Sequence, residues 1–541
     1  MTTAGHLTHT RHAAPSAPSK SMWTHTGLLI RLALRRDRIR LSIWIAMLSL
    51  LMIYTPNALE LAYPEEAQRL ARVNLLKTPA GMMMGGPVFG VDETDLGVMM
   101  ANELMLTLIV ATSILAILTV IRHTRAEEES GTAELVLASV VGRYARTTAA
   151  LSVAAGVNVV LTVTMTAAMV ASGFGVSDSL GMCAGVTAVA MVFAAVAAVT
   201  AQMWRAARAA TGTAMAALAL AALIRGIGDV IDNSGSALSW FSPIAWAQQM
   251  RSFVDLRWWP LALLIGLTLA LVTLAAALER RREYDDATLS SRGEHPGARP
   301  VRGVLALHLV LQRGQTIGWS AGLFIAGLAF GSMTKSLLDA AEGNELIAQM
   351  ISAQGTDGVY MTMSQFLAAA ASAYVVACVL RLHADERSGL GESVLAGAVS
   401  RWRWLSTSVV AAVLGATVLM FFAGLGNGVG AGITLGEPGT VGRLTVAGLA
   451  FVPALAVMAG VAAVGVALRQ PWIGWLAVAS VVLSLYLGAL LRLPRWLIDL
   501  SPVSRTTVPT DVPVVALVVM CVAAATLTVL AGFLYRRRDA A

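Results

Sequence analysis

The segment EEESGTAELVLASVVGR (Glu127 to Arg143) is charged and contains glycine, yet it stands between two long apolar runs. A related segment, DERSGLGESVLAGAVSR (Asp385 to Arg401), begins 258 positions later (385 minus 127). Two copies of one acidic segment, about half the chain apart, predict an internal duplication. At this offset the same residue occurs in nine pairs: Ala126 and Ala384, Glu128 and Glu386, Ser130 and Ser388, Gly131 and Gly389, Glu134 and Glu392, Val136 and Val394, Leu137 and Leu395, Ala138 and Ala396, Arg143 and Arg401.

The composition around these copies is that of a membrane protein. Of the 541 residues, 57% are hydrophobic and only 13% are charged, whereas soluble domains carry about 25% charged residues. Stretches such as WWPLALLIGLTLALVTLAAAL (258–278) can cross a hydrocarbon core, which requires about 20 apolar residues. Residues 1–26 lack the apolar core of a cleavable signal peptide, and we expect them to form a disordered cytoplasmic tail.

The apolar runs predict an all-α integral membrane protein with about twelve transmembrane helices. The predicted spans are 41–57, 101–121, 147–172, 180–203, 210–230, 258–278, 317–333, 362–381, 405–427, 443–468, 472–491 and 513–535.

The arginines predict the orientation of these spans. The net charge of +7 comes from 36 arginines and three lysines. Clusters such as Arg280 to Arg282 and Arg536 to Arg538 all fall on one side of the membrane if twelve spans leave both termini inside. The positive-inside rule identifies that side as cytoplasmic. We therefore expect a multi-pass plasma-membrane protein with both termini in the cytoplasm, whose basic loops reflect topology and do not bind nucleic acid.

Further landmarks divide the chain into two halves. Ser242-Pro243 recurs as Ser501-Pro502, and a basic segment precedes the first span of each half (32–44 and 309–319). Six spans in each half make the predicted repeats parallel. The expected organisation is a tail (1–26), a first six-helix half (27–278), a cytoplasmic linker (279–302) and a second six-helix half (303–541).

The repeated segment itself predicts a short amphipathic helix. Gly131 stands at the N-cap and Glu134 in the first turn, where a carboxylate is favoured; Gly389 and Glu392 correspond to them. The acids can be helix-start residues only, or they can form a surface where a partner protein docks. A helix that merely lies on anionic lipid carries Lys and Arg instead, which favours docking. In the second copy the predicted apolar face is Gly391, Val394, Leu395, Ala398 and Val399.

This pattern resembles ABC-2-type exporter permeases, in the fused twelve-helix form similar to actinobacterial exporters of polyketide (tetronasin-like) antibiotics. In the first copy the motif is carried by Glu127, Gly131, Thr132, Glu134, Leu137 and Arg143. Leu390 replaces Thr132 in the second copy, so the two copies are not identical. The resemblance implies that each copy is a cytoplasmic coupling helix seated on an ATPase subunit, with outward re-entrant helices at the Ser-Pro landmarks. It assigns to coupling Glu127, Glu128, Gly131, Glu134, Arg143, Asp385, Glu386, Gly389, Glu392 and Arg401.

The chain lacks the sequence of a nucleotide site of its own. A P-loop requires a lysine preceded by glycine, and the contexts of Lys20, Lys77 and Lys335 do not provide one. We therefore expect a non-catalytic subunit without cofactor or metal, served by two copies of a separate ATPase that binds ATP and Mg²⁺. Two alternatives remain: a proton-coupled multidrug antiporter, although the predicted spans contain few acids, and a membrane enzyme.

The resemblance also places a path for hydrophobic or amphipathic cargo along the second, fifth, eighth and eleventh spans. Apolar, adaptable side chains at the outer ends of these spans fit such a path, and ordinary packing or lipid contact is the alternative. The candidate path residues are Met99, Met100, Glu103, Met361, Met363, Phe366 and Tyr374.

Overall fold

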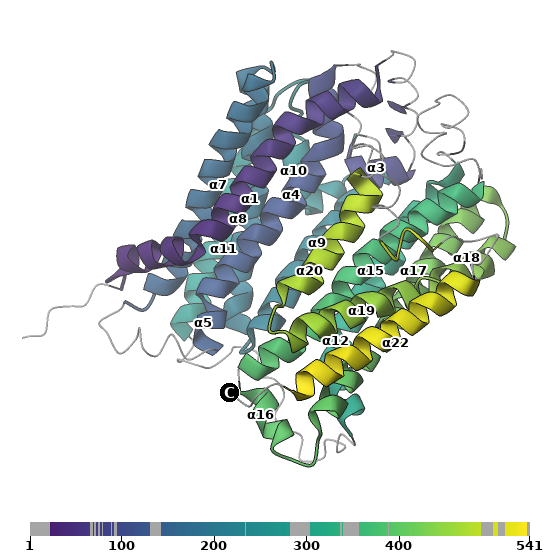
Figure 1. Cartoon of the computed structure of the whole chain (residues 1–541). Coiled ribbons are helices and arrows are strands. Elements are labelled where there is room, and N and C mark those ends of the chain that lie inside the picture. Colours follow the sequence, from purple (N-terminus) through teal and green to yellow (C-terminus); the bar gives the residue numbers. More distant parts are fainter. Residues whose placement is uncertain are drawn as a thin grey trace, which may run out of the picture. The chain divides into compact units, whose positions relative to one another are not determined.

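The computed structural model describes residues 22–64, 69, 72–73, 76–77, 79–87, 89–90, 95–129, 142–232, 234–281, 303–335, 338, 356–387, 389–487, 501–506 and 514–537. These residues form mainly helices and contain no strand (Figure 1). The expected all-α class is confirmed.

Ten stretches of helix in the described ranges are long and apolar enough to cross a membrane. They contain ten of the twelve predicted spans, so the chain is a multi-pass membrane protein. The other two predicted spans are not among the ten. The span 317–333 falls in the helix that begins at Val304, and the described part of 472–491 forms the helix Trp472–Val482 and the turn Leu483–Leu487. The count of twelve stays a prediction.

The chain divides into two compact units, which are described separately. Unit 1 comprises Met1–Ala58, Leu96–Gly228 and Gly235–Gly293. Its described helices are α1 (Thr26–Ala62, which continues beyond the unit), α4 (Leu96–His123), α5 (Arg125–Glu129), α7 (Ala145–Ala171), α8 (Val176–Met203), α9 (Ala207–Ile231, also continuing), η1 (Ser239–Phe241), α10 (Pro243–Gln248) and α11 (Trp259–Arg281).

The core of unit 1 is built around α8. This helix contacts α4, α7, α10 and α11, and its small residues alternate with Val186 and Phe193, both buried. Small side chains let neighbouring helices approach closely in a protein surrounded by lipid, where van der Waals packing drives helix association.

Unit 2 comprises Leu59–Asp95, Asp229–Ser234 and Glu294–Ala541. Its described helices are α3 (Pro79–Gly85), α12 (Val304–Ser332), α15 (Thr356–Arg387), α16 (Leu390–Leu395), α17 (Arg401–Leu435), α18 (Gly439–Leu449), α19 (Val452–Ala467), α20 (Trp472–Val482), η2 (Leu483–Leu487) and α22 (Val514–Arg536). Helix α17 contacts α12, α15, α18, α19 and α22, and forms the centre of the unit.

The predicted span 443–468 is divided into two helices in unit 2. Helix α18 ends at Leu449 and α19 begins at Val452, with Pro453 in its first turn. Proline has no N–H to continue the preceding helix, but its fixed φ suits the start of a new one. The predicted span is therefore present within Gly439–Ala467, with a break between Leu449 and Val452.

The two Ser-Pro landmarks form local turns of the same kind. Ser242 caps the six-residue helix α10, and its Oγ accepts a hydrogen bond from the backbone N of Ile244 at 3.3 Å. Ser501 Oγ accepts from the backbone N of Ser504 at 3.4 Å. Both serines are buried, so each hydroxyl satisfies a main-chain donor where water is excluded.

Glycines bring the main chains of α12 and α17 into direct contact. A Cβ on Gly331 would lie 2.1 Å from the backbone O of Asn427, and one on Gly426 would lie 2.1 Å from that of Phe324. No side chain fits in this space, so glycine is required there by the approach of two helices.

Replacement of Gly331 by alanine should therefore destabilise unit 2. The methyl group would overlap the backbone of α17, and overpacking of this kind costs about 1–3 kcal/mol. The measurement is the thermal midpoint of unfolding in detergent. Gly322 on the same helix, with open space around its Cα, is the matched control; Gly322→Ala should leave the midpoint unchanged or raise it, because alanine favours helix. Equal midpoints for both variants would contradict the close approach.

Candidate functional site

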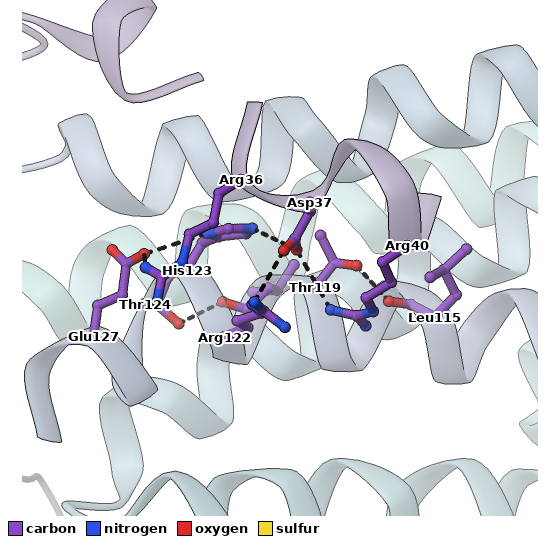
Figure 2. Close-up of polar contacts among 10 residues, drawn as sticks. Arg36, Asp37, Arg40, Leu115, Thr119, Arg122, His123, Thr124 and Glu127 are labelled. Atoms are coloured by element: carbon purple, nitrogen blue, oxygen red, sulfur yellow. Dashed lines mark hydrogen bonds and ion pairs between the residues drawn. The ribbon is translucent and has the colours of Figure 1, made fainter. Parts of the chain in front are cut away.

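The first acidic segment begins in α5, directly after α4. Its Glu127 pairs with Arg36 of α1, whose Nη1 lies 3.2 Å from Glu127 Oε1. The Nδ1 of His123 lies 3.4 Å from the same oxygen (Figure 2). Residues 130–141, which include Gly131 and Glu134, lie outside the described residues. Glu127 therefore connects α5 to α1 and α4.

Asp37 of α1 is the centre of a polar cluster in unit 1. It is only 2% exposed, and His123 Nε2 lies 3.0 Å and Arg122 Nη2 3.1 Å from its carboxylate. Arg40 Nη1 lies 3.4 Å away on the same helix (Figure 2). A buried carboxylate needs such partners, because removal from water is costly for an unpaired charge. The cluster therefore fixes α1 against the end of α4.

The other two acids of the segment are also engaged within unit 1. Glu128 pairs with Arg125 and with Arg146 at the start of α7. Glu129 Oε2 accepts a hydrogen bond from the backbone N of Ala207 at 2.9 Å, at the first residue of α9. A carboxylate at this position also interacts favourably with the helix dipole.

The end of the first segment is held by the turn that precedes α1. The backbone N of Gly142 donates to Thr24 O, and that of Tyr144 donates to Met22 O, both at 3.1 Å. A Cβ on Gly142 would lie 2.2 Å from Met22 O, so this approach requires glycine. Arg143 Nη2 donates to the backbone O of Glu279 and of Arg280 at the end of α11, each at 3.0 Å.

These contacts differ from the expected acidic surface. The side chains of Glu127 and Glu128 are 25% and 10% exposed, and the three acids at the start of the segment face basic groups and a helix N-terminus of their own unit. In the first copy they act as structural links among α1, α4, α7 and α9. Their contact with an ATPase stays a prediction.

The second copy forms a short helix, α16, with two different faces. Gly389 is its N-cap and has a φ of 75°, in the left-handed region that glycine adopts readily. Gly391 is buried, and Val394, Leu395 and Val399 pack against the core of unit 2. Leu390, which is 64% exposed, and Glu392, which is also exposed, lie on opposite flanks of this packed face, because they are two residues apart on the helix. Ala398, expected on the apolar face, lies after the helix end at Leu395 and is exposed.

The acids before α16 are linked to two other helices. Asp385 pairs with Arg381 one turn earlier, with an N–O distance of 3.6 Å. Arg381 Nη1 also donates to the backbone O of Leu311 on α12 at 2.8 Å. Glu386 accepts a hydrogen bond from the hydroxyl of Tyr535 on α22. Arg401 is the first residue of α17, which is capped by the Oγ of Ser400.

The candidate path residues lie on α4 and on α15, which belong to different units. Met99 and Met100 are 0% exposed, and Glu103 is half-buried. On α15, Met363 is buried beside Val359, and the hydroxyl of Tyr374 lies 2.8 Å from Thr316 Oγ1. Met361 is half-buried, and the ring of Phe366 lies 6.2 Å from that of Phe330. Within each unit these side chains pack among neighbours, so their role in a path stays a prediction.

The partners of the acids were not predicted from the sequence. The buried carboxylate of Asp37 could have been found from the sequence. It is a lone acid among arginines at the start of an apolar helix, and its charge must be compensated by a cation once it is buried. Arg146 and Tyr535 lie 18 and 149 positions from the glutamates that they contact. No local pattern indicates contacts at such separations.

Replacement of Asp37 by asparagine should destabilise unit 1, because Arg122, His123 and Arg40 would lose their shared carboxylate. Loss of one partner of a buried pair costs about 3 kcal/mol or more. The control is Asp255→Asn, which removes an exposed pair with Arg257 whose side chains are 39% and 61% exposed; about 1 kcal/mol or less is expected there. Chemical or thermal unfolding in detergent measures both. Equal losses would show that Asp37 is not a buried structural charge.

Comparison with known proteins agrees with this architecture. The family model described as "Multidrug efflux system permease Rv1217c, C-terminal domain" matches residues 30–280 and 301–536. The chain is 34% identical over 553 residues to the multidrug efflux system permease protein Rv1217c of Mycobacterium tuberculosis (strain ATCC 25618 / H37Rv), and the alignment covers 98% of each chain. The chain therefore belongs to this family of multidrug efflux system permeases.

Proposed function

We propose that the chain is the transmembrane permease subunit of an ABC exporter that removes hydrophobic or amphipathic compounds from the cell. Two copies of a separate ATPase bind ATP and Mg²⁺ and drive the cycle through the two acidic segments. The chain lies in the plasma membrane with both termini in the cytoplasm. Its cargo includes antibiotics or other drugs.

The two-faced helix α16 carries this proposal. One face packs against the core of unit 2 through Val394 and Leu395, and Leu390 and Glu392 are exposed on the two flanks of that face. A short, rigidly mounted helix with an exposed apolar residue and an exposed acid is suited to a groove in a partner protein. A displacement of this helix by the partner would be transmitted to α15, with which α16 packs. It would also be transmitted to α22, through the hydrogen bond between Glu386 and Tyr535.

The relative and the sequence support the remaining parts of the proposal. The M. tuberculosis relative is named a permease protein of a multidrug efflux system, which supports cargo export and further subunits here. The three lysines lack the context of a P-loop, so the energy from ATP has to come from another chain.

Charge reversal at Glu392 tests the docking surface. Because this side chain is exposed, Glu392→Lys should keep the thermal midpoint of the wild type. It should lower the affinity for the proposed ATPase partner roughly tenfold, which is about 1.4 kcal/mol. Co-purification and ATP-dependent drug transport in proteoliposomes measure the effect.

The control is Glu437→Lys, an exposed glutamate just beyond the opposite end of α17. It should retain both the ATPase and the transport. Normal co-purification and transport by Glu392→Lys would show that α16 is not the docking helix.

A proton-coupled antiporter is the second candidate, and one observation favours it. Asp229 on α9 is 0% exposed and follows Arg225, 1% exposed, by one helical turn, and buried acids in membrane helices often take part in proton relays. An antiporter would transport drug in vesicles under a pH gradient without nucleotide, and Asp229→Asn would abolish that transport. We expect no transport under these conditions; nucleotide-free transport that depends on Asp229 would support the antiporter.

A further inference from the structure

Residues 31–40 of α1 contain five arginines that fall into two groups. Arg36 and Arg40 point to the acids of unit 1, Glu127 and Asp37. The other three, Arg31, Arg35 and Arg38, are exposed, and within the described part of the chain no hydrogen bond or ion pair involves them.

The three exposed arginines share one face of the helix. Their spacing is i, i+4 and i+7, which places them on one side along about 10 Å of helix. We call Arg31, Arg35 and Arg38 the arginine face. Exposed aliphatic side chains lie beside it: Leu28, Leu32 and Ile39 are 62%, 54% and 68% exposed.

A face that mixes guanidinium groups with aliphatic side chains fits one kind of surface. The apolar side chains enter the acyl boundary of a membrane, while arginine binds phosphate oxygens of the headgroups with its planar fork of donors. The corresponding segment before the second half, 309–319, contains only Arg313, so the feature belongs to the first half.

We propose that the arginine face binds the headgroups of anionic phospholipids in the cytoplasmic leaflet. Through α1, bound lipid fixes both ends of the first acidic segment. The helix holds the beginning of that segment through Arg36 and Glu127. The turn before α1 holds its end through the backbone contacts of Met22 and Thr24 with Tyr144 and Gly142.

The link between lipid and coupling follows from the rigidity of this region. Asp37 fixes the opposite side of the same turns to Arg122 and His123 of α4. Anionic lipid on one side and the segment contacts on the other therefore act on a single stretch of helix. On the proposed exporter function, ATP-driven transport then depends on anionic lipid.

The experiment compares the wild type with two triple variants of the full chain. One replaces Arg31, Arg35 and Arg38 by glutamine, and the other replaces them by lysine, which keeps the charge. Each protein is purified from vesicles of phosphatidylcholine mixed with phosphatidylglycerol, and the retained phosphatidylglycerol is counted by native mass spectrometry. Thermal midpoints are recorded in parallel.

The glutamine variant should lose phosphatidylglycerol with a drop in affinity of about fivefold per arginine, roughly a hundredfold in total. The lysine variant should retain most of it, and high salt should weaken binding to both the wild type and the lysine variant. Midpoints in neutral lipid should match, because the three side chains are exposed. Wild-type lipid retention by the glutamine variant would overturn the proposal, as would a lowered midpoint in both variants.

Measurements of drug transport and ATPase retention distinguish a failure of the lipid inference from a failure of the proposed exporter function. If the glutamine variant keeps phosphatidylglycerol but loses its ATPase, the arginine face contacts the partner protein and the lipid inference is wrong. If lipid is lost as expected but the wild type never needs ATP, the lipid site stands and the exporter function fails. If phosphatidylglycerol stimulates ATP-driven transport by the wild type but not by the glutamine variant, both the lipid site and the exporter function are supported.

Discussion

The structure of unit 1 depends on the neutralisation of charge in an apolar body. Asp37 is buried on α1 in a chain that is 57% hydrophobic, and its carboxylate has to be matched by cations that stay in place. Arg122 supplies such a cation from the last turn of α4, and the Nε2 of His123 lies 3.0 Å from the same carboxylate. Because these residues directly precede the first acidic segment, electrostatic matching also determines where that segment begins.

The two units fix the corresponding position by different chemistry. His123 and Arg381 are 258 positions apart (381 minus 123), and each pairs with an acid one turn later. His123 reaches a carboxylate on α1, whereas Arg381 reaches a backbone carbonyl on α12. Both units link this position to another helix, and in unit 1 the link goes to a buried carboxylate, that of Asp37. This difference fits a pair of segments that diverge already at Thr132 and Leu390.

The fold class and most helices were predictable because hydrophobic runs of membrane length have few alternative structures. The cap at Gly389 and the inward face of Val394 and Leu395 were also readable, since both follow from local spacing. The break at Pro453 was visible in the sequence but was outweighed by the apolar run around it. The partners of Glu127, Glu128 and Glu386 were not predictable, because α1, α7 and α22 meet these acids only after the helices pack.

The contact between α12 and α17 limits how unit 2 can move. Where Gly331 and Gly426 lie, the nearest atoms of the two helices belong to their backbones, so no rotamer change can relax the contact. We therefore expect α12 and α17 to move together as one rigid pair of helices. We expect any motion within unit 2 to occur where helices contact each other through side chains. The interface of α19 and α22, where the side chain of Leu527 packs on Gly460, is of this kind.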